Sequence, residues 1–142
     1  MEKPQMKILC VHAHFDDLEF YGSGTFELFR QKHGDQLRAR SVVCTDGRAG
    51  HHFRTRKETE DIRRKEQQAA AEIAGYETEV LTLPDGSHPR EGCLILDTNF
   101  MAALWHSIRQ FQPDYLFCPP LTSHTLAGLH IDHEAVAEAV RK

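Results

Sequence analysis

The chain lacks a long hydrophobic segment. The apolar run that follows the polar first seven residues covers only residues 8–11. It is far too short for the core of a signal peptide or for a membrane span. We therefore expect a cytoplasmic protein with no membrane partner.

The chain also lacks an excess of positive charge. Its 17 Lys and Arg residues are outnumbered by 21 Asp and Glu residues, and the formal net charge is -4. The basic cluster at residues 54–65 is interleaved with acidic residues, which is typical of a solvated helix face. We find no basic patch of the kind that binds nucleic acid and expect no such partner.

Neither a C-x-x-C pair nor a repeat, low-complexity tract or obvious linker is present. The four cysteines are scattered, and three of them lie in strand-like apolar runs. This favours small buried core residues in a reducing compartment over a disulfide framework. With 142 residues, of which 40% are hydrophobic, the chain is expected to form one domain over residues 1–142.

Apolar runs that are typical of strands alternate with segments of helical periodicity. Capping-box spacing between Thr55 and Glu58 marks one helix start, and Gly75 marks the end of that helix. We expect strands at residues 7–12, 37–44, 78–83 and 115–118, and helices at residues 19–30, 58–74, 97–111 and 130–141.

This β-α alternation predicts an α/β fold: a Rossmann-like, doubly wound, mostly parallel sheet with helices on both faces. Right-handed crossovers give the strand order 3-2-1-4. Strands 1 and 4 then flank the crevice where such sheets bind ligands, beyond the carboxyl ends of the strands. The two densest polar clusters of the sequence follow these two strands.

The first polar cluster reads A-H-F-D-D-L-E at residues 13–19. A nucleotide-binding fold would have a glycine-rich phosphate loop here, and two adjacent carboxylates would repel a pyrophosphate. Histidine and carboxylates suit a cation instead. His14 and Asp17 are three residues apart, so a helical turn would place both on one face while Asp16 points elsewhere. The alternative is that Asp16 or Asp17 caps the following helix.

The second cluster reads H-I-D-H at residues 130–133, at the start of the last expected helix. His130 and His133 can face the same crevice; the alternative is a helix start with Asp132 in its first turn and two exposed histidines. Together the two clusters offer two imidazoles and one carboxylate. This composition leaves a fourth position for water, as in a catalytic zinc site.

A bound zinc ion lowers the pKa of its water toward ~7. The activated water then needs a general base and groups that stabilise the oxyanion, and the remaining polar residues could supply them. Asp16, next to a ligand but free of the metal, suits the role of general base. A protonated His130 could stabilise an oxyanion. Asp132 could hold one of the histidines in the required tautomer.

Four motifs, in order along the chain, resemble the PIG-L/LmbE family of zinc-dependent N-deacetylases, which act on N-acetylglucosaminyl conjugates. The family's A-H-P-D-D, followed by a glutamate and G-G-T, is similar to residues 13–25. Its T-x-G-x-x-G matches residues 45–50, its R-x-x-E with a downstream L-G resembles residues 63–75, and its H-P-D-H resembles residues 130–133.

The resemblance implies Zn²⁺ on three ligands and a small N-acetylated amino-sugar conjugate as the substrate. It implies that Asp16 is the base and that His130 assists the transition state or protonates the leaving amine. Arg63 would hold the substrate, and Asp85 is a weaker candidate for contact with it. The implied metal ligands are His14, Asp17 and His133.

The chain departs from the family pattern at Phe15 and Ile131, which replace the two motif prolines, and at Ser23, which replaces a glycine. Family domains usually continue beyond the last histidine motif, so we expect a fold that is shortened at its C-terminus. The strand at residues 115–118 would then have an open edge. We expect self-association through that edge, or marginal stability, and weak activity alone.

Two other readings remain open at this stage. The same two-histidine, one-carboxylate set could hold Fe²⁺ for oxygen chemistry. Alternatively, the chain could be a metal-bound but weakly active or inactive ligand-binding fragment.

Overall fold

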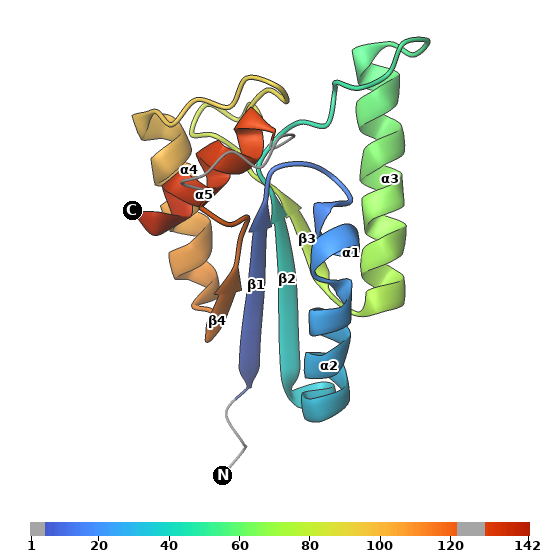
Figure 1. Ribbon diagram of the computed structural model, residues 1–142, viewed down its shortest axis with the longest axis vertical. Coiled ribbons are helices and arrows are strands. Elements are labelled where there is room, and N and C mark those ends of the chain that lie inside the picture. The colour runs from blue at the N-terminus through green and yellow to red at the C-terminus, as the bar shows by residue number, and fades with distance from the viewer. Residues whose placement is uncertain (1–4, 122–129) are drawn as a thin grey trace.

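The computed structural model describes residues 5–121 and 130–142 (Figure 1). Within them, four strands alternate with helices in the order expected from the sequence. The elements are β1 (Met6–His12), α1 (Asp17–Tyr21), α2 (Ser23–His33), the short 3₁₀ helix η1 (Gly34–Gln36), β2 (Leu37–Val43), α3 (Arg56–Ala74), β3 (Glu77–Val80), α4 (Thr98–Phe111), β4 (Tyr115–Phe117) and α5 (Ile131–Arg141).

The four strands form one parallel sheet in the order β3-β2-β1-β4, which confirms the predicted topology. β1 is central: Cys10 is paired with Ser41 of β2 on one side and with Phe117 of β4 on the other. The connection from β3 to β4 crosses back over β2 and β1. The carboxyl end of β1 therefore lies at the point where the winding direction reverses.

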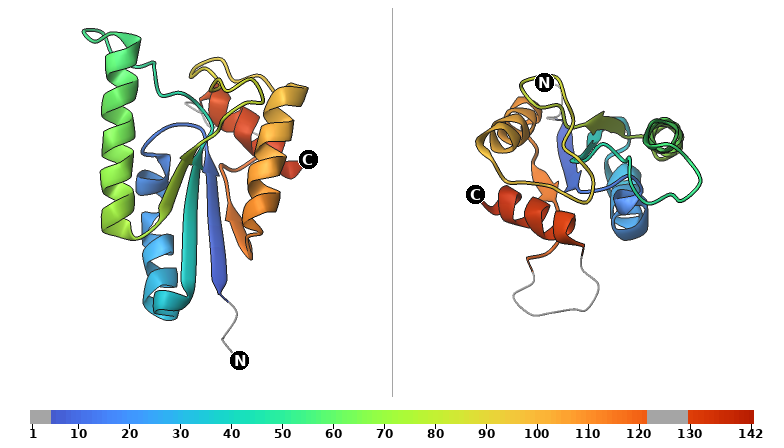
Figure 2. Two further views of the ribbon diagram at one scale, coloured as in Figure 1. Left: turned by 180° about the vertical axis from the view of Figure 1, so that it is seen from behind. Right: turned by 90° about the horizontal axis from the view of Figure 1, so that it is seen from above.

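Helices cover both faces of the sheet, as the views from behind and from above show (Figure 2). Successive residues of β1 point to opposite faces, so Ile8 and Cys10 belong to one core cluster and Leu9 and Val11 to the other. The first cluster is packed with residues of α1, α2 and α3. The second contains residues of α4 and α5, which brings the start of α5 to the end of β1.

The helix boundaries follow the local sequence signals. Thr55 and Glu58 form the predicted capping box at the start of α3, and Gly75 ends the helix in a left-handed conformation with φ 74°. The helix expected at residues 19–30 was wrong in extent, because the chain forms α1 and α2 with a break at Gly22. The amide of Gly22 bonds to Leu18 while its carbonyl accepts from Phe26, so the residue ends one helix and begins the next.

The cysteine prediction is confirmed for Cys10 and Cys44, which are buried, and wrong for Cys93 and Cys118, which are exposed. Burial raises the pKa of the Cys10 thiol to about 12. None of the helices in residues 5–121 and 130–142 has the length and apolar character needed to cross a membrane.

Candidate functional site

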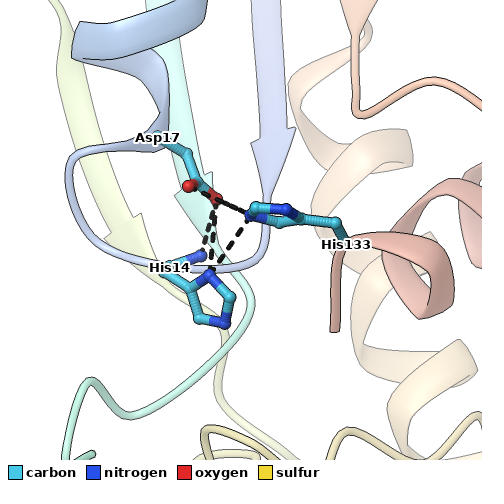
Figure 3. Close-up of side chains that lie close together, drawn as sticks. All are labelled: His14, Asp17 and His133. Atoms are coloured by element: carbon cyan, nitrogen blue, oxygen red, sulfur yellow. Dashed lines mark hydrogen bonds and ion pairs between the residues drawn. The ribbon is translucent and has the colours of Figure 1, made fainter. Parts of the chain in front are cut away.

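The two polar clusters meet at the carboxyl end of β1 (Figure 3). His14 lies in the turn that follows β1, and Asp17 is the first residue of α1. His133 lies in the first turn of α5 and points toward both. The structure therefore brings His133 to His14 and Asp17, which lie more than a hundred positions earlier in the sequence.

The potential ligand atoms of these three residues converge. His133 Nε2 is 3.2 Å from His14 Nδ1 and 3.0 Å from Asp17 Oδ2. His14 Nδ1 is 3.9 Å from the same carboxylate oxygen. One atom from each residue lies within 4.8 Å of the other two, so a single cation could contact all three.

Asp132 fixes the ring orientation of His14. Its Oδ2 atom is 3.0 Å from His14 Nε2. A carboxylate only accepts hydrogen bonds, so Nε2 carries a proton, and in the neutral ring the lone pair of Nδ1 faces His133 and Asp17. Burial alone would lower the pKa of the His14 imidazole, but the hydrogen bond to Asp132 and the charge of Asp17 outweigh it and raise that pKa.

Asp132 is itself fully buried. Its carboxylate accepts hydrogen bonds from the backbone amides of Gly92, at 2.6 Å, and Leu94, at 3.0 Å. Burial would raise the pKa of this carboxyl, but the hydrogen bonds from His14 and the two amides lower it below its usual value. Asp132 therefore links the start of α5 to both the turn after β1 and the loop that precedes α4.

Asp17 is held by the turn rather than by a helical face. Its Oδ2 atom accepts from the amides of Ala13, at 3.1 Å, and His14, at 2.9 Å. The expectation that a helical turn aligns His14 with Asp17 was wrong, because α1 begins only at Asp17. Burial would raise the pKa of Asp17, but the hydrogen bonds with His133 and the His14 amide lower it.

Asp16 contacts α3 through both its carboxylate and its backbone amide. It is the N-cap residue of α1, with φ 73°, and its side chain makes no capping hydrogen bond. Arg63 donates to its Oδ2 atom at 3.0 Å, and Gln67 accepts from its amide at 3.2 Å. The structure thus joins Asp16 to Arg63, the residue expected to hold the substrate.

His130 is the N-cap residue of α5, and its Nδ1 atom accepts from the Asp132 amide at 3.2 Å. Its ring centroid is 4.5 Å from that of His14 in an edge-on arrangement. Asp85, by contrast, lies in the exposed turn after β3, where it accepts from the amide and hydroxyl of Ser87. These contacts hold the turn together and do not place Asp85 at the cluster.

Some contacts around the site were not predicted from the sequence. His12 is buried, and its Nδ1 is 2.7 Å from the carbonyl of His14. A carbonyl only accepts, so Nδ1 donates and Nε2 accepts from the Ser41 hydroxyl at 2.6 Å. Alternation along β1 could have paired His12 with β2, but not with the backbone of its own turn.

Phe15, which replaces the motif proline, is also buried and packs against Gly47 of the T-D-G-R-A-G motif. Gly47 has φ 68°, and a Cβ atom there would lie 2.4 Å from the Phe15 ring. The turn after β1 is therefore supported by ring packing against a second motif.

A cavity of about 340 Å³ adjoins the candidate metal site. Asp17 and His133 form part of its wall, and most of its other lining is apolar. Leu18, Phe26 and Phe117 are among the apolar lining residues. The site is thus open to a space of the size that a small molecule needs.

A doubly wound parallel sheet with two histidines and a carboxylate at its switch point defines an α/β domain with a candidate catalytic metal site. The chain belongs to the PIG-L family, described as GlcNAc-PI de-N-acetylase, whose match covers residues 9–142.

A curated relative, mycothiol S-conjugate amidase from Streptomyces coelicolor, is 30% identical over 130 residues. The alignment covers 79% of this chain and 43% of the relative, so the chain spans less than half the length of that enzyme.

Solved structures share the fold at lower sequence identity. N,N'-diacetylchitobiose deacetylase from Pyrococcus horikoshii is similar with a TM-score of 0.79 and 24% identity, covering 94% of this chain and 47% of that one. The hydratase GalB from Pseudomonas putida KT2440 is similar with a TM-score of 0.77 and 22% identity, covering 96% and 55%. A deacetylase of teicoplanin biosynthesis has a TM-score of 0.61 and 16% identity, covering 96% and 64%.

Proposed function

We propose that this chain carries the catalytic site of a zinc-dependent hydrolase that removes an N-acetyl, or other N-acyl, group from a small amino-sugar conjugate. The observation that carries the proposal is the convergence of His14 Nδ1, His133 Nε2 and the Asp17 carboxylate, with Asp132 behind His14.

The donor set fits a divalent cation. His14 Nδ1 and His133 Nε2 lie 3.2 Å apart, and His14 Nδ1 presents a lone pair because Asp132 keeps the ring proton on Nε2. A carboxylate that orients a histidine from behind is the usual second partner of a metal-bound imidazole. Two imidazoles and one carboxylate are also a composition found in catalytic zinc sites. His14, Asp17 and His133 would hold the ion.

Zinc bound there would supply Lewis-acid activation of a water molecule and of an amide carbonyl. Asp16 accepts the proton of the attacking water, while Arg63 orients its carboxylate through Oδ2. His130 Nδ1 accepts from a backbone amide, so the neutral ring carries its proton on Nε2. From that atom His130 can donate a hydrogen bond to the transition-state oxyanion, and the proton that Asp16 accepts can pass to the amine that leaves. Arg63 and, more weakly, Asp85 are the proposed substrate contacts.

Membership of the PIG-L family supports amide hydrolysis, as does the relative named as an amidase. The similarity to a hydratase shows that the fold alone does not select the reaction. Fe²⁺ is the second metal to test, because the same ligand types also bind iron.

The test measures metal content and deacetylation on one preparation. Purified protein is loaded with Zn²⁺ or Fe²⁺, its metal content is determined, and free amine is measured with N-acetylglucosamine conjugates. We expect one equivalent of zinc and release of amine. His133→Ala should lose both, whereas His106→Ala, at an exposed position of α4, should keep both. Equal zinc content in parent and His133→Ala would refute the ligand assignment.

Self-association through β4 is a further proposal. β4 is the edge strand of the described sheet, and half of the Tyr115 surface is exposed there. An open edge presents unpaired backbone groups to another strand. Sedimentation velocity over a range of concentrations should show a dimer, and a monomer at all concentrations would contradict it.

A further inference from the structure

Gln67 is a buried polar side chain on α3 that the proposed chemistry does not use. It is only 3% exposed, and its amide group makes three hydrogen bonds. Oε1 accepts from the backbone amide of Asp16 at 3.2 Å. Nε2 donates to Glu19 Oε1 at 3.1 Å and to the hydroxyl of Tyr76 at 2.7 Å.

The chemistry of these partners fixes the orientation of the Gln67 amide. A backbone N–H only donates, so the atom that faces Asp16 is the oxygen, and the NH₂ group faces Glu19 and Tyr76. Tyr76 donates its own hydroxyl proton to Glu19. Burial, followed by the hydrogen bond to Glu19, raises the pKa of Tyr76, so the phenol keeps that proton. The three side chains form a closed network between α1, α3 and the residue that follows Gly75.

Asp16 needs such support because its backbone is in an unfavourable region. With φ 73° it is left-handed, which costs a residue with a side chain roughly 1–2 kcal/mol. Its side chain makes no hydrogen bond that caps α1. Contacts from α3 compensate: Arg63 donates to the carboxylate, and Gln67, one helical turn later, accepts from the amide.

We propose that Gln67 is a positioning residue that holds Asp16, through its backbone amide, in the conformation needed for its role. This rests on the proposed function only in so far as Asp16 is the general base. The geometric part, that Gln67 holds the amide of Asp16, stands independently of any activity.

The network also explains why glutamine suits the position. Methionine would supply neither the acceptor nor the donor. Glutamate would supply the acceptor but place a second carboxylate beside Glu19. Among the contacts of the described residues, Glu19 Oε2 is buried with no hydrogen-bond partner. A second buried charge would therefore meet a carboxylate whose hydrogen bonding is already incomplete.

The first experiment is independent of activity. Amide hydrogen exchange of Asp16 is followed by NMR in the parent and in Gln67→Met. We expect exchange of Asp16 to become about tenfold faster, as the loss of one hydrogen bond predicts. The matched control is Gln68→Met at the neighbouring exposed position, which should leave this exchange rate unchanged. If Gln67→Met does not fold, Gln67→Asn keeps the amide but is too short to reach Asp16, and should give the same acceleration.

The second experiment tests the effect on turnover and includes a rescue. Gln67→Glu should lower kcat about tenfold, with KM and zinc content near the parental values. The swap Gln67→Glu with Glu19→Gln restores one carboxylate and one amide in exchanged places, and it should recover most of kcat. A general loss of stability would instead lower zinc content and the melting temperature along with activity.

The outcomes separate the two proposals. Unchanged exchange of Asp16 in Gln67→Met and Gln67→Asn overturns the positioning role, whatever the activity. Faster exchange in the two variants, together with a parent protein that has no deacetylase activity, supports the positioning of Asp16 and counts against the proposed function. Faster exchange together with unchanged kcat overturns the link between the position of Asp16 and turnover.

Discussion

The turn after β1 and the first turn of α5 each supply histidine and carboxylate groups to the candidate site, but the fold holds them differently. The turn after β1 is fixed from several sides: Thr45 donates to the Ala13 carbonyl, His12 donates to that of His14, and Arg63 and Gln67 hold Asp16. These supports come from β1, α3 and the segment after β2.

The start of α5 depends mainly on one buried group. Besides the contacts of His133 and His130 with the turn after β1, Asp132 joins it to His14, Gly92 and Leu94, and Val136 and Ala139 pack further along the helix. The same kinds of residue are therefore held by contacts from several segments in the turn after β1 and mainly by one buried carboxylate at the start of α5. A single substitution should therefore disturb the α5 side more than the β1 side, except where it removes the chemistry itself.

The largest expected effect is on the chemistry of the turn after β1. Asp16→Asn removes the proposed proton acceptor but leaves the proposed metal ligands intact. Turnover should fall about 10²–10⁴-fold, the usual contribution of a general base, with zinc content unchanged. Steady-state kinetics with metal analysis checks this, and Asp61→Asn, at a partly exposed position of α3 that pairs with Lys57, is the control. If Asp16→Asn kept the parental kcat, the general base would have to be another residue.

The second effect is on the anchor of α5. Asp132→Ala leaves the amides of Gly92 and Leu94 and the ring of His14 without their acceptor. We expect the free energy of unfolding to fall by about 4 kcal/mol, as for a broken buried charge network. Urea denaturation of the metal-free protein measures it. Glu134→Ala, exposed in the same helical turn, should have almost no effect; equal losses in the two variants would remove the contrast between the two sides.

The third effect tests whether the turn after β1 can be disturbed sterically. Gly47→Ala places a Cβ atom 2.4 Å from the Phe15 ring at a residue with φ 68°. We expect a loss of about 3 kcal/mol from overpacking and backbone strain together. Gly50 has φ 85° with nothing within 4 Å of its Cβ position, so Gly50→Ala reports the strain alone. The difference between the two variants isolates the contact with Phe15, and no difference would mean that the ring moves aside freely.

The smallest effect is expected at Glu60, which lies farther from the site and links α3 to the segment after β2. Glu60 is buried on α3 and accepts from Arg48 at 2.7 Å and from Arg64 at 3.0 Å. Burial would raise the pKa of its carboxyl, but the hydrogen bonds from Arg64 and Arg48 lower it. Glu60→Gln should cost about 1 kcal/mol at neutral pH, because both partners are partly exposed.

The pH dependence of that cost has a definite sign. A carboxyl whose pKa is lowered by folding adds stability that is fully present above its unfolded pKa, about 4.3, and is lost as pH falls through the folded value. Parent and Glu60→Gln should therefore differ at pH 7 and converge in acid. Denaturation curves at several pH values test this; a difference that persists in strong acid would contradict the assignment to charge.

Much of this architecture could be predicted from the sequence, because local signals and topology rules agree. The alternation of strand and helix patterns predicted the parallel sheet and its order, and Thr55, Glu58 and Gly75 bounded α3 correctly. The switch-point rule predicted where the two clusters meet. Gly22 was harder to read, since a glycine can interrupt a helix or remain within it, and only the packed structure decides.

The contacts behind the site could not be predicted in the same way. Asp132 was expected to hold a histidine, and it does lie 3.0 Å from His14 Nε2. Its other partners, the amides of Gly92 and Leu94, come from an irregular loop whose path has no periodic signal. Gln67 is one helical turn after Arg63, which is a usable clue, but its partners depend on the left-handed turn at Asp16. Such turns at residues other than glycine are too rare to expect.

The contact between His14 and His133 joins positions 119 residues apart in the chain. Contacts of such long range form late in folding, because the entropy of closing a long loop must first be overcome. If the proposed site binds zinc, capture by all three proposed ligands should therefore begin only when α5 has docked on β1. A cation bound in this way would stabilise the docked state by mass action, because it would link the turn after β1 to the start of α5. The rate of zinc uptake during refolding would then report the rate at which α5 docks, separately from the earlier pairing of β2 with β1.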